Sequence, residues 1–367
     1  MNHSTRPEVA RVRPERPYPD AVPRLASPAG QPLLDETDLD IAAAMHIAPR
    51  VPTAALADIV GLPVSTLSRR LARLQEERLL RVVGRYAWEL ITSSNPYELW
   101  ITSAPGRSRA VLAELLRIPD VQFVLQTSGP ADLYANLFPL RGSDQEELLG
   151  SVIPSIPGVR AVDSRMILEP AKVGQAWRYH RLDDERVARL DEHAALVAQP
   201  PLHDLGQLSD LEFETMRMLG TNARVTAAEV GRTLGVSAST AARAIRLLLQ
   251  TGAVSPRVEM QSDLLGYPLH AVVTIDVQPR DVSRTLERVA LHPSVRLLST
   301  VTGSAPISLS GVFRGPGDLA TFIRDDLGAL PWVRSIQSVT GLRLQRRYWI
   351  DRDGPRLGAQ VPDVLRR

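Results

Sequence analysis

Hydroxyl and arginine side chains gather at the start of a helical pattern that follows Gly61. Residues 61–80 read GLPVSTLSRRLARLQEERLL, with Leu67, Leu71 and Leu74 recurring at helical spacing. The amides at a helix N-terminus and nearby arginines can face phosphates, while side chains on the same helix reach base edges. We therefore predict that this helix contacts double-stranded DNA. The predicted contact residues are Ser65, Thr66, Ser68, Arg69, Arg70 and Arg73.

A second segment of this kind follows Gly235 and reads GVSASTAARAIRLLLQTGAV. Here Ala244 stands in the place of Arg70. Leu247 stands in the place of Arg73, so apolar side chains cover more than one face of this helix. Either segment could instead be the solvated face of a helix that only packs, and this alternative carries more weight for the second. The predicted contact residues of the second segment are Ser239, Thr240, Arg243 and Arg246.

Residues for catalysis or metal binding are scattered along the chain. The seven histidines do not pair at the i, i+4 spacing of a helical metal site. The chain has no cysteine, which excludes disulfides, thiolate ligands and thiol nucleophiles. Neither a Walker loop nor a G-x-G-x-x-G stretch is present. We predict that the protein is not an enzyme and needs no cofactor.

The composition is that of a globular protein with more than one domain. The chain has 367 residues, and 43 basic and 41 acidic residues leave a net charge of only +2. Any DNA contact must therefore come from local patches of charge. No apolar run approaches the roughly 18 residues that a membrane span requires, and the N-terminus lacks the apolar middle of a signal peptide. We expect a cytoplasmic protein that does not enter membranes.

The two segments belong to a longer internal repeat. Gly235 lies 174 residues after Gly61, and the same offset relates distant positions without a gap. It predicts a tandem duplication of a unit of about 150 residues. The other matching pairs include Arg50 with Arg224, Val51 with Val225, Gly129 with Gly303, and Pro157 with Pro331.

Each predicted unit has two parts. Three short helices with a glycine turn before the last are typical of a helix-turn-helix, and RVVGRY (81–86) follows as a short wing or hinge strand. The remainder predicts the strand and helix order βαββαβ of a ferredoxin-like domain, so the fold class is α+β. We expect the sheets of the two units to pair within the chain. Hinge strands around Trp88–Ile91 and Val258–Gln261 should cross between the units.

These patterns divide the chain into seven segments. The predicted segments are a disordered Pro/Arg-rich tail (1–32), helix-turn-helix domain 1 (33–85), ferredoxin-like domain 1 (86–180), a linker helix (181–206), helix-turn-helix domain 2 (207–257), ferredoxin-like domain 2 (258–350) and a C-terminal tail (351–367).

This order of motifs resembles the Lrp/AsnC family of bacterial transcriptional regulators. The resemblance is carried by Leu34-Asp35-x-x-Asp38, by Arg70-Leu-Ala-Arg73-Leu-Gln in the third helix, and by Ser128-Gly129-x-x-Asp132-Leu and Ile156-Pro-Gly-Val159 in the second part. It implies that the third helix enters the DNA major groove and that the second part senses an amino acid or similar metabolite. It also implies dimerisation, so the fused units would form a pseudo-dimer within the chain, with homo-oligomers beyond it.

The resemblance places the effector near the Gly-x-x-Asp turn. The Asp132 carboxylate could accept hydrogen bonds from a ligand amine, or equally from backbone amides that close the turn. The second copy reads Gly303-Ser-Ala-Pro306 and has no carboxylate, so the two turns should differ in ligand binding. The predicted ligand-binding residues are Ser128, Gly129, Asp132, Tyr134, Thr302 and Gly303.

Two alternatives to a regulator stay open. The siroheme decarboxylases share the architecture, but they carry a His-Asn-Tyr stretch and a Tyr-Asn-x-Trp-Phe stretch in the central strands. Here those strands read VQFVLQTS (121–128) and DLYANLF (132–138), without either motif. The other alternative is a DNA-free metabolite sensor or assembly protein, which the polar face of the first helix disfavours but that of the second does not.

Overall fold

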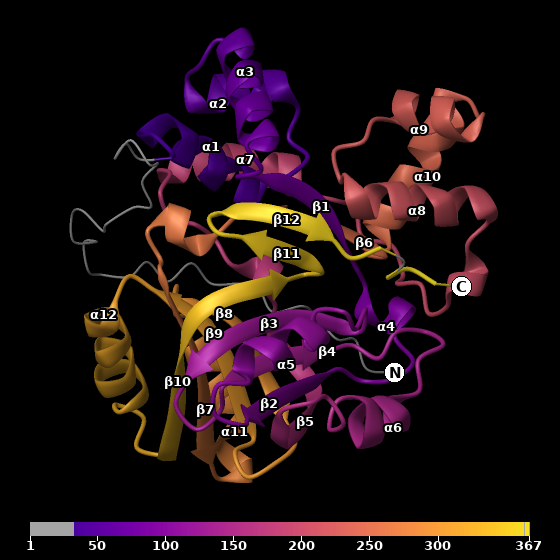
Figure 1. Ribbon diagram of the computed structural model, residues 1–367. Coiled ribbons are helices and arrows are strands. Elements are labelled where there is room, and N and C mark those ends of the chain that lie inside the picture. Colours follow the sequence, from indigo (N-terminus) through magenta and orange to yellow (C-terminus); the bar gives the residue numbers. More distant parts are fainter. Residues whose placement is uncertain (1–32, 363, 367) are drawn as a thin grey trace.

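The same order of elements occurs twice along the chain, as the repeat predicts (Figure 1). The computed structural model describes residues 33–362 and 364–366, so the predicted tail 1–32 lies outside the described residues. The first set is α1 (Glu36–Ile47), α2 (Thr53–Val60), α3 (Val64–Glu76), β1 (Arg81–Tyr86), α4 (Trp88–Ile91), β2 (Tyr97–Ser103), α5 (Ser108–Leu115), β3 (Val121–Ser128), β4 (Leu133–Leu137), α6 (Gln145–Glu147), η1 (Leu148–Val152), β5 (Val159–Lys172) and η2 (Gly174–Ala176).

The second set follows a linking helix and ends in two additional strands. The linking segment holds α7 (Asp184–Ala194) and η3 (Leu205–Gln207). The second set is α8 (Asp210–Thr221), α9 (Ala227–Leu234), α10 (Ala238–Gln250), β6 (Val254–Glu259), η4 (Ser262–Leu265), β7 (Leu269–Val277), η5 (Pro279–Asp281), α11 (Val282–Ala290), β8 (Val295–Val301), β9 (Ile307–Phe313), α12 (Pro316–Thr321), η6 (Phe322–Leu327) and β10 (Val333–Arg347), followed by β11 (Ile350–Asp353) and β12 (Arg356–Gln360).

The helix-turn-helix geometry follows from its turn glycines and caps. Gly61 ends α2 with φ of 72°, and Gly235 ends α9 with φ of 70°. This left-handed conformation disfavours any residue with a Cβ, so a glycine at each turn sends the next helix off at an angle. Ser237 caps α10 by accepting a hydrogen bond from the Thr240 amide at 3.1 Å.

The strands of both ferredoxin-like units form one closed sheet in the lower part of Figure 1. The order β3-β4-β2-β5-β8-β9-β7-β10 returns to β3 because β10 pairs with both β7 and β3. β5 plays the equivalent part between β2 and β8. The sheets of the two units therefore pair within one chain. Separate apolar clusters lie between each unit's strands and its helices, and a further cluster around Trp100 and Tyr134 draws on strands of both units.

The hinge strands cross between the halves at RVVGRY (81–86), one of the predicted positions, and at a strand that overlaps the predicted 258–261, but not at Trp88–Ile91. β1 and β6 pair antiparallel, centred on Val83 opposite Arg257, whereas Trp88–Ile91 is the short helix α4 and not a strand. β1 packs beneath α8 so closely that a Cβ at Gly220 would lie 1.7 Å from the Tyr86 hydroxyl. Met260, just after β6, packs in the core of the first helix-turn-helix. Each DNA-type domain therefore rests on the hinge of the other half.

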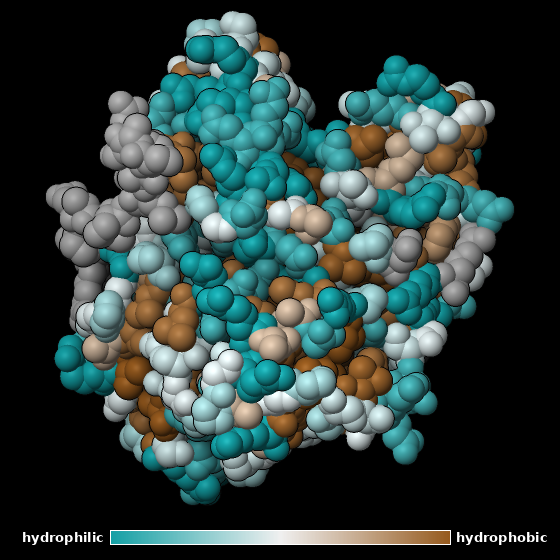
Figure 2. Space-filling view, in the orientation of Figure 1, coloured by the Kyte–Doolittle hydropathy of each residue, from teal (hydrophilic) through white to brown (hydrophobic). Residues whose placement is uncertain are grey.

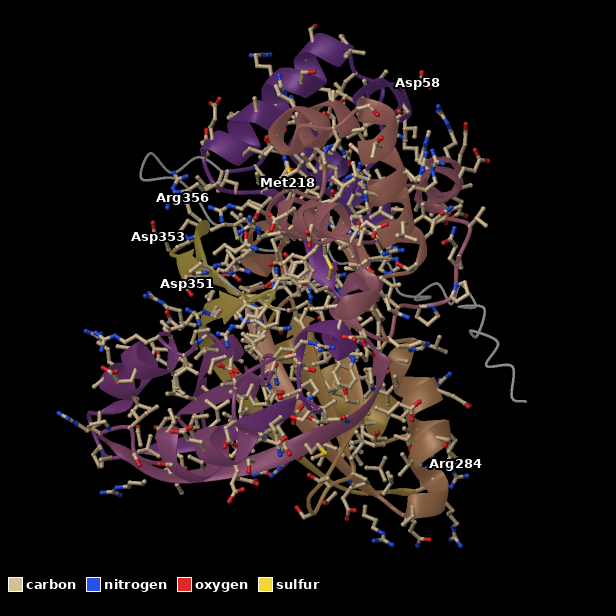
Figure 3. All side chains as sticks on the ribbon, turned by 90° about the vertical axis from the view of Figure 1, so that its right-hand side faces the viewer. Asp58, Met218, Arg284, Asp351, Asp353 and Arg356 are labelled. Carbon is tan, nitrogen blue, oxygen red and sulfur yellow. The ribbon has the colours of Figure 1, made fainter. Side chains whose placement is uncertain are left out.

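The predicted C-terminal tail is wrong, because residues 350–360 form the hairpin β11–β12. Figure 3 shows Asp351, Asp353 and Arg356 along this hairpin, below the first helix-turn-helix. Arg356 donates to the Glu77 carbonyl at 2.8 Å, and Asp353 pairs with Arg78 at 2.9 Å. The hairpin thus holds the end of α3, an interaction that the sequence repeat cannot reveal because the first half has no counterpart of it.

Candidate functional site

The outer face of α3 carries polar side chains that are free to meet a partner. Ser65, Ser68 and Arg69 are exposed, and Thr66 is partly buried. Arg69 makes no ion pair with any residue that the structure describes. Figure 2 shows that the lobe formed by these helices, at the top, is covered mainly by hydrophilic side chains. This face offers a cation and hydroxyls without competing acidic partners.

Arg70 and Arg73 are held by carboxylates of the same domain. The Asp38 side chain is buried and pairs with Arg70 at 2.9 Å and with Arg73 at 2.5 Å. Arg70 also donates a hydrogen bond to the Asp35 carboxylate at 2.7 Å, and this interaction raises the pKa of Arg70. Burial raises the pKa of Asp35, but hydrogen bonds from the Asp38 amide and Arg70 outweigh it and lower that pKa. These two predicted DNA contacts therefore also tie α3 to α1.

The corresponding face of α10 is divided between solvent and core. Ser239, Arg243 and Arg246 are exposed, and neither arginine forms an ion pair with a described residue. Thr240 is partly buried and its hydroxyl lies 2.8 Å from that of Ser237. Ala244 is buried, whereas Arg70 at the equivalent position of α3 is partly exposed. The helix keeps two arginines without ion pairs, and Ala244, which replaces the arginine of α3, is buried.

The predicted ligand-binding turns are engaged in contacts within the protein. The Asp132 carboxylate accepts hydrogen bonds from the Ser103 amide at 2.7 Å and hydroxyl at 2.9 Å, so it ties the turn to the end of β2. Tyr134 is 1% exposed and lies inside the closed sheet, where Asn136 donates to its hydroxyl. Neither residue lines either of the two hollows described below.

The other predicted ligand residues join the halves of the sheet. The Ser128 hydroxyl lies 2.8 Å from the Thr340 hydroxyl, and the Thr302 hydroxyl accepts from the Met166 amide at 2.8 Å. Gly129 and Gly303 have φ of 123° and 112°, and a Cβ at Gly303 would approach Arg165. The repeat explains this symmetry, since each turn meets the long last strand of the other unit.

A cavity of about 120 Å³ lies where β1 and β6 meet the closed sheet. None of the six predicted ligand residues lines it, and no acidic residue is among its described lining residues. In the sequence, this cavity is indicated only by the charged Arg85 within the predicted hinge strand, a residue that is not among the predicted site residues. The lining residues are Arg85, Tyr86, Trp88, Ile91, Pro96, Gln122, Asn136, Phe138, Ile167, Pro170, Val173, Gly174, Arg257, Leu297, Ser299, Tyr348 and Trp349.

Two aromatic residues in the cavity wall have an unusual backbone conformation. Tyr348 and Trp349 form the two-residue turn between β10 and β11, with φ of 53° and 58°. Glycine or asparagine ordinarily occupies such turns, and a bulky residue with positive φ costs about 1–3 kcal/mol. The Tyr348 hydroxyl accepts from the Tyr86 amide at 2.6 Å, and the Trp349 indole donates to the Pro119 carbonyl at 2.7 Å. These hydrogen bonds hold both rings in the wall.

Arg257 connects the cavity with a buried cluster of charges. It pairs with Glu259, which is fully buried and also accepts from Arg347 at 2.9 Å and Arg352 at 2.7 Å. Burial raises the pKa of Glu259, but these arginines outweigh it and hold the pKa well below its usual range. Buried Arg296 adds another cation, and several guanidinium nitrogens of the cluster lack a hydrogen-bond partner among the described residues. The cluster carries excess positive charge.

A second hollow of about 430 Å³ is open to solvent at the start of α11. The Arg284 guanidinium lies 3.8 Å from the ring centroid of Trp332, which occupies the place of Gly158 in the first half. Figure 3 shows Arg284 at the periphery of the molecule. The described residues contain no group of three histidine, cysteine, aspartate or glutamate side chains placed to hold a metal ion. Nor does that part of the chain have a helix both long and apolar enough to span a membrane.

Two family models match different halves of the chain. The AsnC-type helix-turn-helix domain matches residues 34–75, which contain α1 to α3. The Lrp/AsnC ligand binding domain matches residues 270–344, which contain β7 to most of β10. The match to the helix-turn-helix domain thus lies in the first unit, and the match to the ligand binding domain lies in the second unit.

Comparison with known proteins gives relatives that span one unit. An uncharacterised HTH-type transcriptional regulator of Pyrococcus abyssi is 26% identical over 36% of this chain and 84% of its own length. The HTH-type transcriptional regulator Ptr1 of Methanocaldococcus jannaschii is 23% identical over 37% and 93%. Among solved structures, the siroheme decarboxylase NirDL aligns with a TM-score of 0.56 and 13% identity, covering 85% of this chain and 93% of that chain. This last likeness concerns the fold.

Proposed function

We propose, on the premise that this chain belongs to the Lrp/AsnC family of transcriptional regulators, that it reads its operator chiefly through α3. The observation that carries the proposal is the free polar face of α3 within the segment that matches the AsnC-type helix-turn-helix domain. Arg69 is exposed there beside Ser65 and Ser68, without an internal carboxylate to neutralise it. An unpaired arginine near a helix N-terminus can bind phosphate or guanine.

The second helix-turn-helix acts as a weaker reader in this proposal. α10 offers Arg243 and Arg246 to DNA. α3 offers Arg69, and it also offers Arg70 and Arg73 when these leave their carboxylate partner Asp38. Because the two helices differ in their side chains, the half-sites of the operator need not match. The regulator works in the cytoplasm, responds to a small metabolite through the ferredoxin-like units, and assembles beyond the single chain.

A decarboxylase function receives less support from the same molecule. The cavity at the hinge measures about 120 Å³. That is below the 300–1,000 Å³ of ordinary sites for drug-sized ligands, and a tetrapyrrole is larger than these. This size concerns the hinge cavity alone, and the absence of the two decarboxylase motifs from the central strands is what favours a regulator.

Fluorescence anisotropy with labelled DNA from the promoter of its own gene tests the proposal. Binding should be tighter than to unrelated DNA of equal length and should weaken steeply with salt. Arg69→Ala should reduce the affinity roughly tenfold or more. Arg117→Ala, an exposed arginine near the end of α5, is the matched control and should bind as the wild type does. Equal affinity for promoter and unrelated DNA would overturn the proposal.

A further inference from the structure

The pseudo-twofold relation between the halves predicts two equivalent hollows at the hinge, but the second place is filled. At three of the equivalent positions, 174 residues further on, the side chain is larger or charged and is buried. Arg296 there lies 4.3 Å from the ring of Trp177, which closes the space. Within the described residues, the hollow with this lining lies on one side of the pseudo-twofold axis, where β1 and β6 meet the closed sheet. The replacements are Pro96 by His270, Gln122 by Arg296 and Val173 by Arg347.

The charges around the cavity indicate what it can hold. Arg85 projects into it from β1 and Arg257 from β6. The Nε atoms of both guanidinium groups are buried and lack a hydrogen-bond partner among the described residues, and Arg257 is nine-tenths buried. The Ser299 hydroxyl, fully buried in the wall, likewise has no partner there. Buried donors of this kind are ordinarily satisfied. Arg257 already pairs with Glu259, but Arg85 has no ion-pair partner among the described residues, and this additional cation calls for an anion.

The rest of the wall limits the size and character of the ligand. Tyr86, Trp88, Phe138, Tyr348 and Trp349 supply an aromatic lining. The volume of about 120 Å³ is slightly below that of an apolar protein cavity of about 150 Å³ known to bind benzene. Because the cavity is also partly open, one aromatic ring or a branched chain of similar size is the upper limit for the ligand body, and its anionic group must be small.

We propose that this cavity binds a small monocarboxylate whose body is a single aromatic ring or a branched aliphatic chain. The carboxylate would accept hydrogen bonds from Arg85 and Arg257, and the body would contact the aromatic wall. This inference rests on the proposed function for its consequence: the ligand is the effector. Because β1 and β6 connect the helix-turn-helix domains to the sheet, a carboxylate bridging them alters the hinge on which both domains rest.

Binding is tested on the full chain without DNA, using benzoate, phenylacetate and 4-methylvalerate as probes and benzamide as the uncharged control. Trp88 and Trp349 line the cavity, so tryptophan fluorescence should titrate with at least one carboxylate and much less with benzamide. At saturation the same compound should raise the Tm by about 5 °C or more. If none of the three carboxylates at 20 mM changes either signal, the proposal is wrong.

Two variants locate the binding. Ser299→Leu places in the cavity wall the side chain that its counterpart Leu125 has, and should abolish the titration by filling the space. Arg85→Met should weaken binding roughly tenfold or more by removing one charged donor. Arg81→Met, on the same strand but outside the lining, should bind as the wild type does. Unchanged affinity in Arg85→Met would overturn the site even if Ser299→Leu failed to fold.

The DNA measurement separates this inference from the proposed function. The bound carboxylate should change the affinity for promoter DNA several-fold in the wild type and not in Arg85→Met. If the carboxylate binds but promoter DNA is not recognised with or without it, the site stands and the regulator proposal fails. If promoter DNA is recognised but no carboxylate binds, the regulator proposal stands and the cavity inference fails.

Discussion

Arg50 and Arg224 each donate hydrogen bonds to the backbone carbonyls next to the other residue, across the pseudo-twofold axis. The Arg224 guanidinium donates to the carbonyls of Pro49 at 2.8 Å and Val51 at 2.9 Å. Arg50 returns hydrogen bonds to the carbonyls of Ala223 and Val225. The two arginines are equivalent residues of the repeat, so one pair of side chains holds the helix-turn-helix domains together. The relative position of α3 and α10 depends on this contact.

Removing one member of this pair should loosen the two DNA-type domains. Arg224→Met deletes two charged donors to backbone carbonyls, each of which contributes about 1.5–3 kcal/mol in proteins. We expect the free energy of unfolding to fall by about 3 kcal/mol or more and the affinity for a two-half-site operator to drop more than that for a single half-site. Arg217→Met, at an exposed i,i+3 ion pair on α8, is the control. Equal loss for both DNA lengths would contradict the assigned role.

Arg69 and Arg70 should separate DNA binding from stability. Arg69 has no ion pair among the described residues, so Arg69→Ala should weaken promoter binding and leave the Tm within about 1 °C of wild type. Arg70 contacts Asp35 and Asp38, so Arg70→Ala should lower the Tm by several degrees. Anisotropy and thermal unfolding of both variants provide the comparison. A stability loss confined to Arg69→Ala would reverse the assignment.

Asp38 should matter far more for stability than another aspartate of the same domain. Its buried carboxylate faces Arg70 and Arg73, and breaking a buried ion pair costs about 3–5 kcal/mol. Asp38→Asn should lower the free energy of unfolding by roughly 3 kcal/mol, measured by urea denaturation. Asp58 pairs with Arg189 at the surface, where Figure 3 shows it at the edge of the domain. Asp58→Asn should cost less than about 1 kcal/mol, and a similar loss in both variants would contradict the distinction.

Stability should fall as the pH drops below about 6.5. Burial, with Arg347 and Arg296 nearby, lowers the pKa of His270 to about 3, and burial likewise lowers that of His46 to about 3. Both residues are neutral when folded and bind a proton below about 6.5 when unfolded, so the unfolded chain binds more protons in this window. Each histidine lowers the free energy of unfolding by about 1.4 kcal/mol for every unit that the pH drops. Urea titrations at pH 5.0 to 6.5 give the slope of the free energy of unfolding against pH. This slope should be visibly smaller in His270→Gln than in the wild type, and an unchanged slope would contradict the pKa assignment.

Most of the local structure could be predicted from residue patterns. The helical spacing around Leu67, the glycine at position 61 and the alternation of strands are local properties, and the offset of 174 repeats them in the second half. The error at Trp88–Ile91 is also local: four residues there form one helical turn beside the real hinge strand. The C-terminal hairpin escaped prediction because the repeat has no counterpart for it.

The candidate sites divide in the same way. The sequence alone predicts that α3 has a polar face with an arginine near its start, because helix periodicity decides which residues share a face. Whether Arg70 and Arg73 are free depends on Asp38, which lies on another helix and reaches them only after packing. The cavity depends on contacts of still longer range. Arg85, Arg257 and Trp349 are far apart along the chain, and only the crossing of β1 and β6 and the strained turn after β10 bring them to one wall.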